Sequence, residues 1–226
     1  MKKQIAILAA IFVAGGLSAF GQGYVNFTTG GGFVYDEFTT PGSDVASSAT
    51  VDVTFLWATT GATDLFGTGV ATTGSNSGAT GFGELSTMLS SGWSIAYNVG
   101  GASPVEAQVL TSSSGLAKGG INYSSSFALG TSTGADSTAG GTYQFVVVGW
   151  NAAAGSTLEA AMADASAFGW SSSFQYASGA SSSSPVSALS SSGLSKFGVA
   201  PVPEPTTLAL AGLGGLSMLF LRRRKA

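Results

Sequence analysis

Apolar and polar residues alternate along much of the chain, which is typical of β-strands that expose one face to solvent. The alternation is clearest in residues 51–57, where every second residue is Val, Phe or Trp, and in residues 93–99, where every second residue is Trp, Ile, Tyr or Val. Shorter stretches with the same pattern are residues 24–27, 33–35, 105–110 and 121–129. We predict a strand in each of these segments.

Residues 142–150 differ, because Phe145, Val146, Val147 and Val148 follow one another without a polar interruption. Such a run is expected of a strand that is covered on both faces, so we predict that it is the central strand. Turn-rich segments separate the strands, at residues 59–62, 72–80 and 131–141. The pattern predicts a mainly β fold, an antiparallel β-sandwich or jelly roll, over residues 22–177.

One short helix is predicted after the central strand. Leu158, Ala161, Met162 and Ala165 recur at helical spacing. Ser156 and Glu159 have the spacing of a capping box at its start, and Gly169 is expected to stop it. We expect this helix to pack against an edge or end of a sheet.

Residues 178–200 are dominated by serine, which makes up ten of the eighteen residues from 178 to 195. Val186, Leu189 and Leu194 are the larger apolar residues of that stretch. So few apolar side chains bury too little surface to offset the entropy of ordering, so a flexible linker is predicted. Whether O-linked sugars are attached to its serines is left open.

Residues 1–21 have the three parts of a secretory signal peptide: Lys2 and Lys3, then an apolar run over residues 5–13, then small residues. Cleavage after Gly21 satisfies the small-residue rule, and cleavage after Ala19 is an alternative. We therefore predict a signal helix, passage through the secretion machinery and removal by signal peptidase.

The other end of the chain, residues 201–226, combines a proline-rich stalk, an apolar segment and a basic terminus. The prolines at 201, 203 and 205 favour an extended conformation. Residues 206–221 are sixteen residues without a charge, about 24 Å as a helix, and we predict a C-terminal transmembrane helix there. The four basic residues that follow would stay in the cytoplasm and leave the body outside.

The order of these features resembles the PEP-CTERM sorting signal of Gram-negative bacteria, many of which make exopolysaccharides. The resemblance lies in Pro203, Glu204 and Pro205, the glycine-containing apolar segment, and the closing cluster of Arg222, Arg223 and Arg224. It covers about the last 25 residues of the chain and implies nothing about the body. In that family the tripeptide is read by exosortase, a membrane protease-transpeptidase. The resemblance therefore implies exosortase as a partner, a transient anchor in the inner membrane, and delivery to the cell envelope, surface or extracellular matrix.

The chain contains no cysteine and no histidine. This removes disulfides, thiol nucleophiles, imidazole bases and the usual zinc and haem ligands. Between residues 22 and 199 two basic residues face ten acidic ones, which gives 2 − 10 = −8. Nucleic acid is therefore excluded as a partner, because its binding depends on Lys and Arg. No cofactor or metal is predicted.

Three groups of residues were candidates for chemistry. Asp36, Glu37 and Asp44 offer carboxylates for calcium or glycoside hydrolysis, but the spacing fits no EF-hand and a solvated loop is the better interpretation. Lys118 and Lys196 are each preceded three positions earlier by glycine, so no S-x-x-K nucleophile is present. The third group is aromatic and consists of four tryptophans, Trp57, Trp93, Trp150 and Trp170, which we assign to the core, with Trp170 the least firmly placed.

The sequence thus predicts an exported, non-enzymatic cell-surface or extracellular-matrix protein. A carbohydrate-binding module of the exopolysaccharide matrix that uses exposed tryptophans, with exopolysaccharide as its partner, is the alternative. A hydrolase built on two converging carboxylates is a third reading. The ligand, strand order and oligomeric state do not follow from the sequence.

Overall fold

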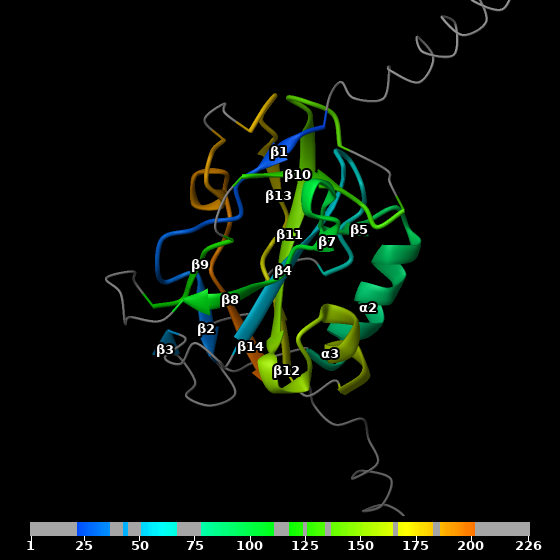
Figure 1. The fold of residues 1–226 in the computed structure, drawn as a ribbon. Helices are drawn as coiled ribbons and strands as arrows, with labels where there is room; N and C mark the ends of the chain where they lie inside the picture. Colours follow the sequence, from blue (N-terminus) through cyan, green and yellow to red (C-terminus); the bar gives the residue numbers. More distant parts are fainter. Residues whose placement is uncertain are drawn as a thin grey trace, which may run out of the picture.

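A computed structural model describes the body of the protein, namely residues 22–36, 43–44, 51–66, 78–110, 118–123, 126–133, 137–164, 167–182 and 186–201. The predicted signal peptide, and the sorting segment beyond residue 201, lie outside these residues. The described part is mainly β, as predicted, and its strands form two sheets (Figure 1). Within it, no helix is long and apolar enough to cross a membrane.

The larger sheet has the strand order β3-β2-β14-β12-β11-β4-β8-β9, with β13 also paired to β11 and β5 to β4. Its strands are β2 (Val34–Asp36), β3 (Ser43–Asp44), β4 (Val51–Thr59), β5 (Ser94–Ile95), β8 (Ala107–Leu110), β9 (Gly120–Ile121), β11 (Thr142–Asn151), β12 (Ala167–Trp170), β13 (Phe174–Ala177) and β14 (Phe197–Pro201). All of these pairs are antiparallel except β14 with β2, which is parallel. The prediction of a purely antiparallel arrangement is therefore wrong at that pair.

The smaller sheet has the order β1-β10-β6-β7 and is antiparallel throughout. Its strands are β1 (Tyr24–Val25), β6 (Tyr97–Asn98), β7 (Ser103–Pro104) and β10 (Phe127–Gly130). A hydrogen bond from the Trp57 indole to the carbonyl oxygen of Gly130, 3.3 Å long, joins it to the larger sheet. Short 3-10 helices occupy Val99–Gly101 (η1), Ala152–Ala154 (η3) and Leu189–Ser191 (η4).

Strand β11 is central, as predicted from its unbroken apolar run. It pairs with β4 over nine residues, from Tyr143 opposite Thr59 to Asn151 opposite Val51. Its other edge pairs with β13 in the first half and with β12 in the second. Strand β4 is buried on both faces as well, although its sequence alternates. The polar side chains of Asp52 and Thr54 are consequently buried, and the hydroxyl of Thr54 donates to the carbonyl oxygen of Val105.

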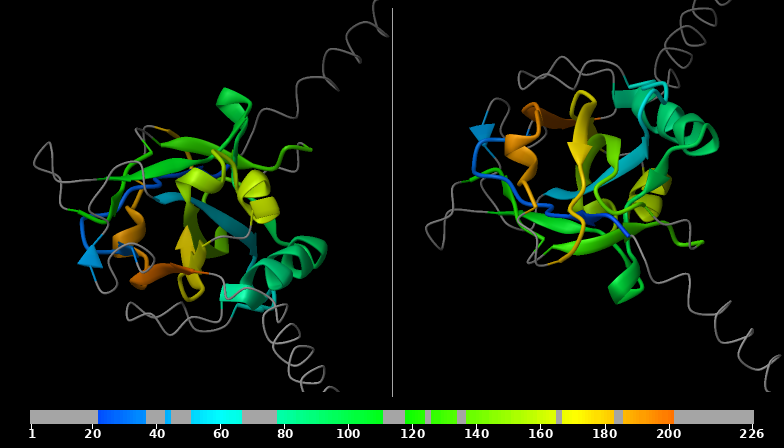
Figure 2. Two further views of the ribbon diagram at one scale, coloured as in Figure 1. Left: turned by 90° about the horizontal axis from the view of Figure 1, so that it is seen from below. Right: turned by 90° about the horizontal axis from the view of Figure 1, so that it is seen from above.

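Two apolar clusters lie on the two faces of β4 and β11. The first contains Phe55 and Phe145 and extends to Val25 and Leu129 of the smaller sheet, so it fills the space between the sheets. The second contains Leu56 and Val148, together with side chains of two helices. In both views of Figure 2 these helices lie on the same side of β4. The body therefore has three layers: smaller sheet, larger sheet and helices.

The predicted helix is present as α3 (Leu158–Asp164) and packs Leu158 and Ala161 into the second cluster. Its predicted boundaries are wrong. The hydroxyl of Thr157 accepts from the backbone N–H of Ala160 at 3.2 Å, so Thr157 is the capping residue in place of Ser156. Gly169, the predicted stop, lies in β12.

A second helix, α2 (Gly78–Ser90), was not predicted, since its first turns contain Gly78, Gly81 and Gly83 and resemble a turn. Leu85 and Met88, three positions apart and fully buried, attach it to the second cluster. The spacing of Leu85 and Met88 was the signal in the sequence from which this helix could have been predicted.

The prediction of a linker over residues 178–200 is wrong for the described residues. Leu189 is fully buried, Leu194 is 6% exposed, and residues 197–201 form β14 inside the larger sheet. Few apolar residues suffice here because each occupies a place that the rest of the body leaves open in the first cluster. The folded body therefore extends to residue 201.

Candidate functional site

Strand β14 is an inner strand, and it ends where the basic, apolar and proline-rich tail begins. On one side it pairs with β12, placing Pro201 opposite Ala167, and on the other with β2, placing Phe197 opposite Val34. Phe197, Val199 and Ala200 are fully buried. The last described residue, Pro201, is therefore still held in the sheet.

The contact between β12 and β14 depends on glycine. A Cβ atom on Gly169 would collide with the carbonyl oxygen of Gly198 in the neighbouring strand. A Cβ atom on Gly149 of β11 would lie 2.9 Å from the side chain of Val199. These close approaches fix β14 against the centre of the sheet.

The chain that leaves β14 matches a family model described as a PEP-CTERM protein-sorting motif, over residues 201–225. Residues 201–225 carry a PEP-CTERM sorting motif. The match includes all six residues singled out above, Pro203, Glu204, Pro205, Arg222, Arg223 and Arg224, which lie outside the described residues. No curated protein and no solved structure matches the chain. The sorting motif thus identifies the tail, and the body remains unmatched.

The four tryptophans are all in the core, Trp170 included. Trp57, Trp93, Trp150 and Trp170 are exposed by 7%, 2%, 0% and 2%. The indole N–H of Trp93 donates to the carbonyl oxygen of Thr63 at 2.9 Å, and the ring of Trp170 stacks on Phe66 with centroids 5.1 Å apart. None of these rings offers the flat exposed platform on which the carbohydrate-binding alternative depended.

Two of the three acidic residues singled out in the sequence lie on the paired strands β2 and β3. Asp36 lies in β2 and is 4% exposed, so a solvated loop is the wrong interpretation for it. It is paired with Ser43, whereas Asp44 is paired with Tyr35. Glu37 lies outside the described residues.

A different acidic group lies where β4 and residue 106 approach α3. Asp52 is 8% exposed, its Oδ1 has no hydrogen-bond partner among the described residues, and burial raises its pKa. Glu106 accepts from the backbone N–H of Leu158 at 3.3 Å. Burial raises the pKa of Glu106, as do the charges of Glu159 and Asp52, while the Leu158 hydrogen bond lowers it.

Sequence reasoning missed this acidic group because its members are far apart in the chain. Asp52 also occupies a polar position of an alternating strand, which normally faces solvent. Among the described residues no set of acidic side chains is arranged to hold a metal ion. The group therefore bears on stability and on local charge.

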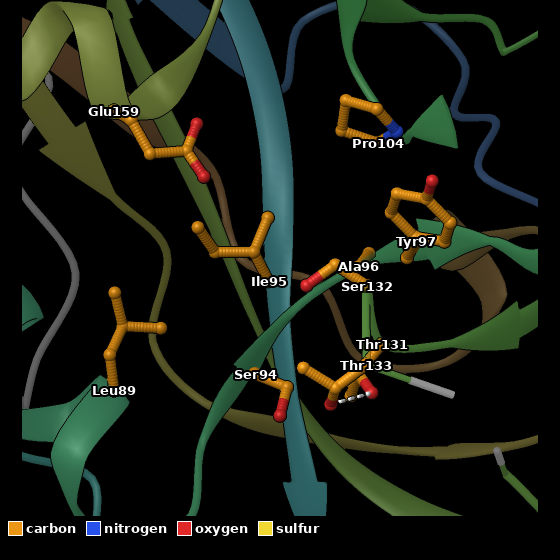
Figure 3. Close-up of a pocket in the computed structure, with 10 residues that line it drawn as sticks. All are labelled: Leu89, Ser94, Ile95, Ala96, Tyr97, Pro104, Thr131, Ser132, Thr133 and Glu159. Carbon is orange, nitrogen blue, oxygen red and sulfur yellow. Dashed lines mark hydrogen bonds between the residues drawn. The ribbon is translucent and has the colours of Figure 1, made fainter. Parts of the chain in front are cut away.

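A pocket of about 410 Å³ opens beside the acidic group, between the two sheets' ends and the helices (Figure 3). Tyr97 and Pro104 lie on one side of it, and Leu89 and Glu159 on the other. Its other lining residues are Ser94, Ile95, Ala96, Thr131, Ser132 and Thr133. The lining contains one carboxylate, several hydroxyls and no basic side chain, which suits an uncharged polar ligand better than an anion.

Proposed function

We propose that the protein is exported, sorted by exosortase through its PEP-CTERM motif, and delivered to the cell surface or extracellular matrix, where its role is non-enzymatic. The match of residues 201–225 to the sorting motif carries this proposal. Exosortase is the partner that the motif implies, in the envelope of a Gram-negative bacterium.

The arrangement of the whole sequence supports the same route. A signal peptide over residues 1–21 would start export, and an apolar helix over residues 206–221 would hold the protein in the inner membrane. The basic residues that follow would keep the tail end in the cytoplasm. Secretion machinery, signal peptidase and the membrane are then the successive partners.

The non-enzymatic role is supported by what the sequence offers for chemistry. The chain has no histidine or cysteine. General bases and nucleophiles are usually assembled from such groups. A folded body with a polar, weakly charged surface fits a structural role outside the cell.

The test is the mass of the mature protein, recovered from envelope and extracellular fractions of its own organism. We expect a chain that begins after residue 19 or 21 and ends within residues 203–206, or carries an adduct there. Glu204→Ala should keep the full tail, and Ser190→Ala, an exposed change in the body, should be processed normally. A natural chain that still ends at Ala226 in the inner membrane would refute the proposal.

A second candidate function is binding of a neutral saccharide in the pocket. The specific observation is its lining, which combines the rings of Tyr97 and Pro104 with the hydroxyls of Thr131 and Ser132. Aromatic rings contact the apolar faces of sugars, and hydroxyls exchange hydrogen bonds with them. The carboxylate of Glu159 can accept from two sugar hydroxyls and would repel an acidic polymer.

Calorimetry with a neutral hexose tetrasaccharide and with a polyuronate of equal length tests this candidate. We expect binding of the neutral sugar, weakened about tenfold or more by Tyr97→Ala and little changed by Tyr97→Phe. Glu159→Gln should reduce the difference in affinity between the neutral sugar and the polyuronate, because it removes the charge that repels the latter. The pocket would be excluded as a saccharide-binding site by either of two results. One is that Tyr97→Ala binds the neutral sugar as tightly as the natural protein does, and the other is that the natural protein binds neither sugar nor exopolysaccharide from the producing organism.

A further inference from the structure

The sorting motif begins without a spacer from the folded body. Pro201 is both the last residue of β14 and the first residue of the motif match. Pro203, the first residue of the Pro203-Glu204-Pro205 tripeptide, is two positions later. The serine-rich stretch that resembles a spacer is instead folded into the body through Leu189 and Leu194.

Release of β14 from the sheet would be costly. The strand has a partner on each side, and its detachment would expose Phe197, Val199 and Ala200, all fully buried. It would also break the hydrogen bond from the backbone N–H of Phe197 to the carbonyl oxygen of Phe33, 2.9 Å long. Inner, buried strands belong to the part of a protein that opens least often.

Enzymes that cut or transfer peptides hold their substrates as extended segments several residues long. Upstream of Pro203 the chain offers Val202 and then enters the sheet at Pro201. An enzyme that reads the tripeptide therefore meets the body at once, since residues before 201 cannot enter its cleft while β14 is paired.

We propose that the fold itself limits processing of this protein. Every cut lies after Pro201, and exosortase must act in direct contact with the end of the body at which β14 leaves the sheet. This inference rests on the proposed function. In the step, one peptide bond after Pro201 breaks, and its carbonyl carbon bonds to water or to an amine or hydroxyl acceptor. The nitrogen takes up the proton and leaves with the tail.

The end of the body around Pro201 is suited to such a close approach. The register places Pro201 opposite Ala167 of β12, level with the last residues of β11 one strand further on, and β11 runs into Ala152–Ala154. On its other side β14 pairs with β2, whose last residue, the buried Asp36, lies opposite Val199. The alanines at 152–154 and 167 are small and uncharged. Five residue steps separate Pro201 from residue 206, which is at most about 18 Å of fully extended chain.

The first experiment follows processing of the full chain in its own host by pulse-chase and C-terminal mass analysis. One variant carries a six-residue Gly-Ser spacer between Pro201 and Val202. We expect its processing to be faster by about threefold or more, because the spacer separates motif and body. The same spacer after Gly140, an exposed turn residue at which an added Cβ atom would meet no other atom, should leave the rate of processing unchanged.

The second experiment is limited proteolysis of the purified full chain in detergent with a broad-specificity protease. The body fragment should end at or after residue 201. Gly169→Ala, which forces β12 and β14 apart, should add cuts within residues 186–200, whereas Gly30→Ala, with no atom near its Cβ, should not.

The outcomes separate the two proposals. Equal processing rates with and without the spacer, or a natural end upstream of Pro201, would overturn the inference and leave the proposed function standing. No processing of any chain in the host would overturn the proposed function and the inference together. Early proteolysis within residues 186–200 of the natural chain would overturn the inference through its structural premise.

Discussion

At the scale of single residues, the unusual feature of the body is a buried carboxylate near one end of its central strand pair. Asp52 lies opposite Trp150 in β11 and opposite Gln108 in β8, and is 8% exposed. Its Oδ1 has no hydrogen-bond partner among the described residues. A buried charge without a partner destabilises the folded state, and the negative charge of Glu106 nearby adds repulsion.

We expect Asp52→Asn to raise the free energy of unfolding at pH 7 by about 1 kcal/mol. Burial raises the pKa of Asp52 above its ordinary value of 3.8. The contribution of Asp52 to stability is therefore most favourable below pH 3.8, where its carboxyl is neutral in the folded and unfolded states. It becomes unfavourable as the pH rises through the raised pKa of the folded protein. The gain from the substitution should accordingly disappear near pH 3.

Urea unfolding at the two pH values measures this gain. Asp64→Asn is the matched control, because the partly exposed carboxylate of Asp64 accepts from the backbone N–H of Phe66 at 2.9 Å. Neutralising it should bring no increase. A loss of stability on Asp52→Asn at pH 7 would show that Asp52 has a favourable partner.

Tyr176 illustrates the opposite case, a buried polar group that is fully paired. Its hydroxyl donates to the carbonyl oxygen of Ser187 at 2.6 Å and accepts from the backbone N–H of Asn26 at 3.1 Å. Burial raises the pKa of Tyr176 to about 12, although the Asn26 hydrogen bond lowers it. One side chain thus ties β13 to both ends of the described chain.

The pKa of Tyr176 is 10 in the unfolded chain and about 12 in the folded protein. We therefore expect its neutral form to contribute fully to stability below pH 10, and this contribution to be lost as the pH rises through about 12. Ultraviolet titration should show one of the six tyrosines ionising late, and Tyr176→Phe should remove that step. The same substitution should lower stability at pH 7 by about 1 kcal/mol. A late step that persists in Tyr176→Phe would assign it to another tyrosine.

At the scale of elements, the strongest patterns in the sequence were the most reliable. The unbroken apolar run of residues 142–150 predicted the central strand β11, and the four-residue spacing of Leu158 and Met162 predicted α3. The prediction of a linker over residues 178–200 failed because it inferred disorder from their serine-rich composition. A core needs a few apolar side chains in the right places, and these places are set by distant strands that no local pattern reveals.

The functional features also divide into those that a local pattern predicts and those that it does not. The sorting motif depends on residues adjacent in the chain, so the sequence alone predicted it. The pocket and the acidic group combine β4, α3 and the residues after β10, which approach only once the sheets form. Their members, such as Glu159 and Thr131, are ordinary surface residues in any local reading.

We expect Leu189→Ala to lower the free energy of unfolding by about 2–4 kcal/mol, because Leu189 is fully buried in the cluster between the sheets. Thermal or urea unfolding measures the change. Ser190→Ala, one residue later and exposed, should change stability little. If both substitutions were neutral, residues 186–201 would be the linker that their composition resembles.

At the scale of the whole molecule, the body is a three-layered unit whose two ends leave it at opposite poles. Tyr24 is bridged to Gly179, near the first residues of β11, while Pro201 lies near its last residues. Figure 1 shows β1 at the top of the body and the end of β14 beside β12 at the bottom. The chain thus enters at one end of the central strand and leaves at the other.

This organisation fixes the limits of the folding unit. We expect a chain of residues 22–201 to fold with the melting temperature of the longer chain 22–205, whereas a chain of residues 22–177 should not fold. The chain of residues 22–177 lacks β14, which pairs with both β12 and β2. Circular dichroism and thermal melts decide the matter, and cooperative unfolding of 22–177 would return the boundary to residue 177.

The opposite placement of the two ends makes the body a spacer in its own right. Strand β11 has ten residues and spans about 30 Å, so a chain attached through Pro201 presents residue 22 at the far tip. A passenger peptide or epitope joined ahead of Gln22 would be displayed outermost, clear of the attachment. The same body could therefore serve as a cysteine-free scaffold for surface display.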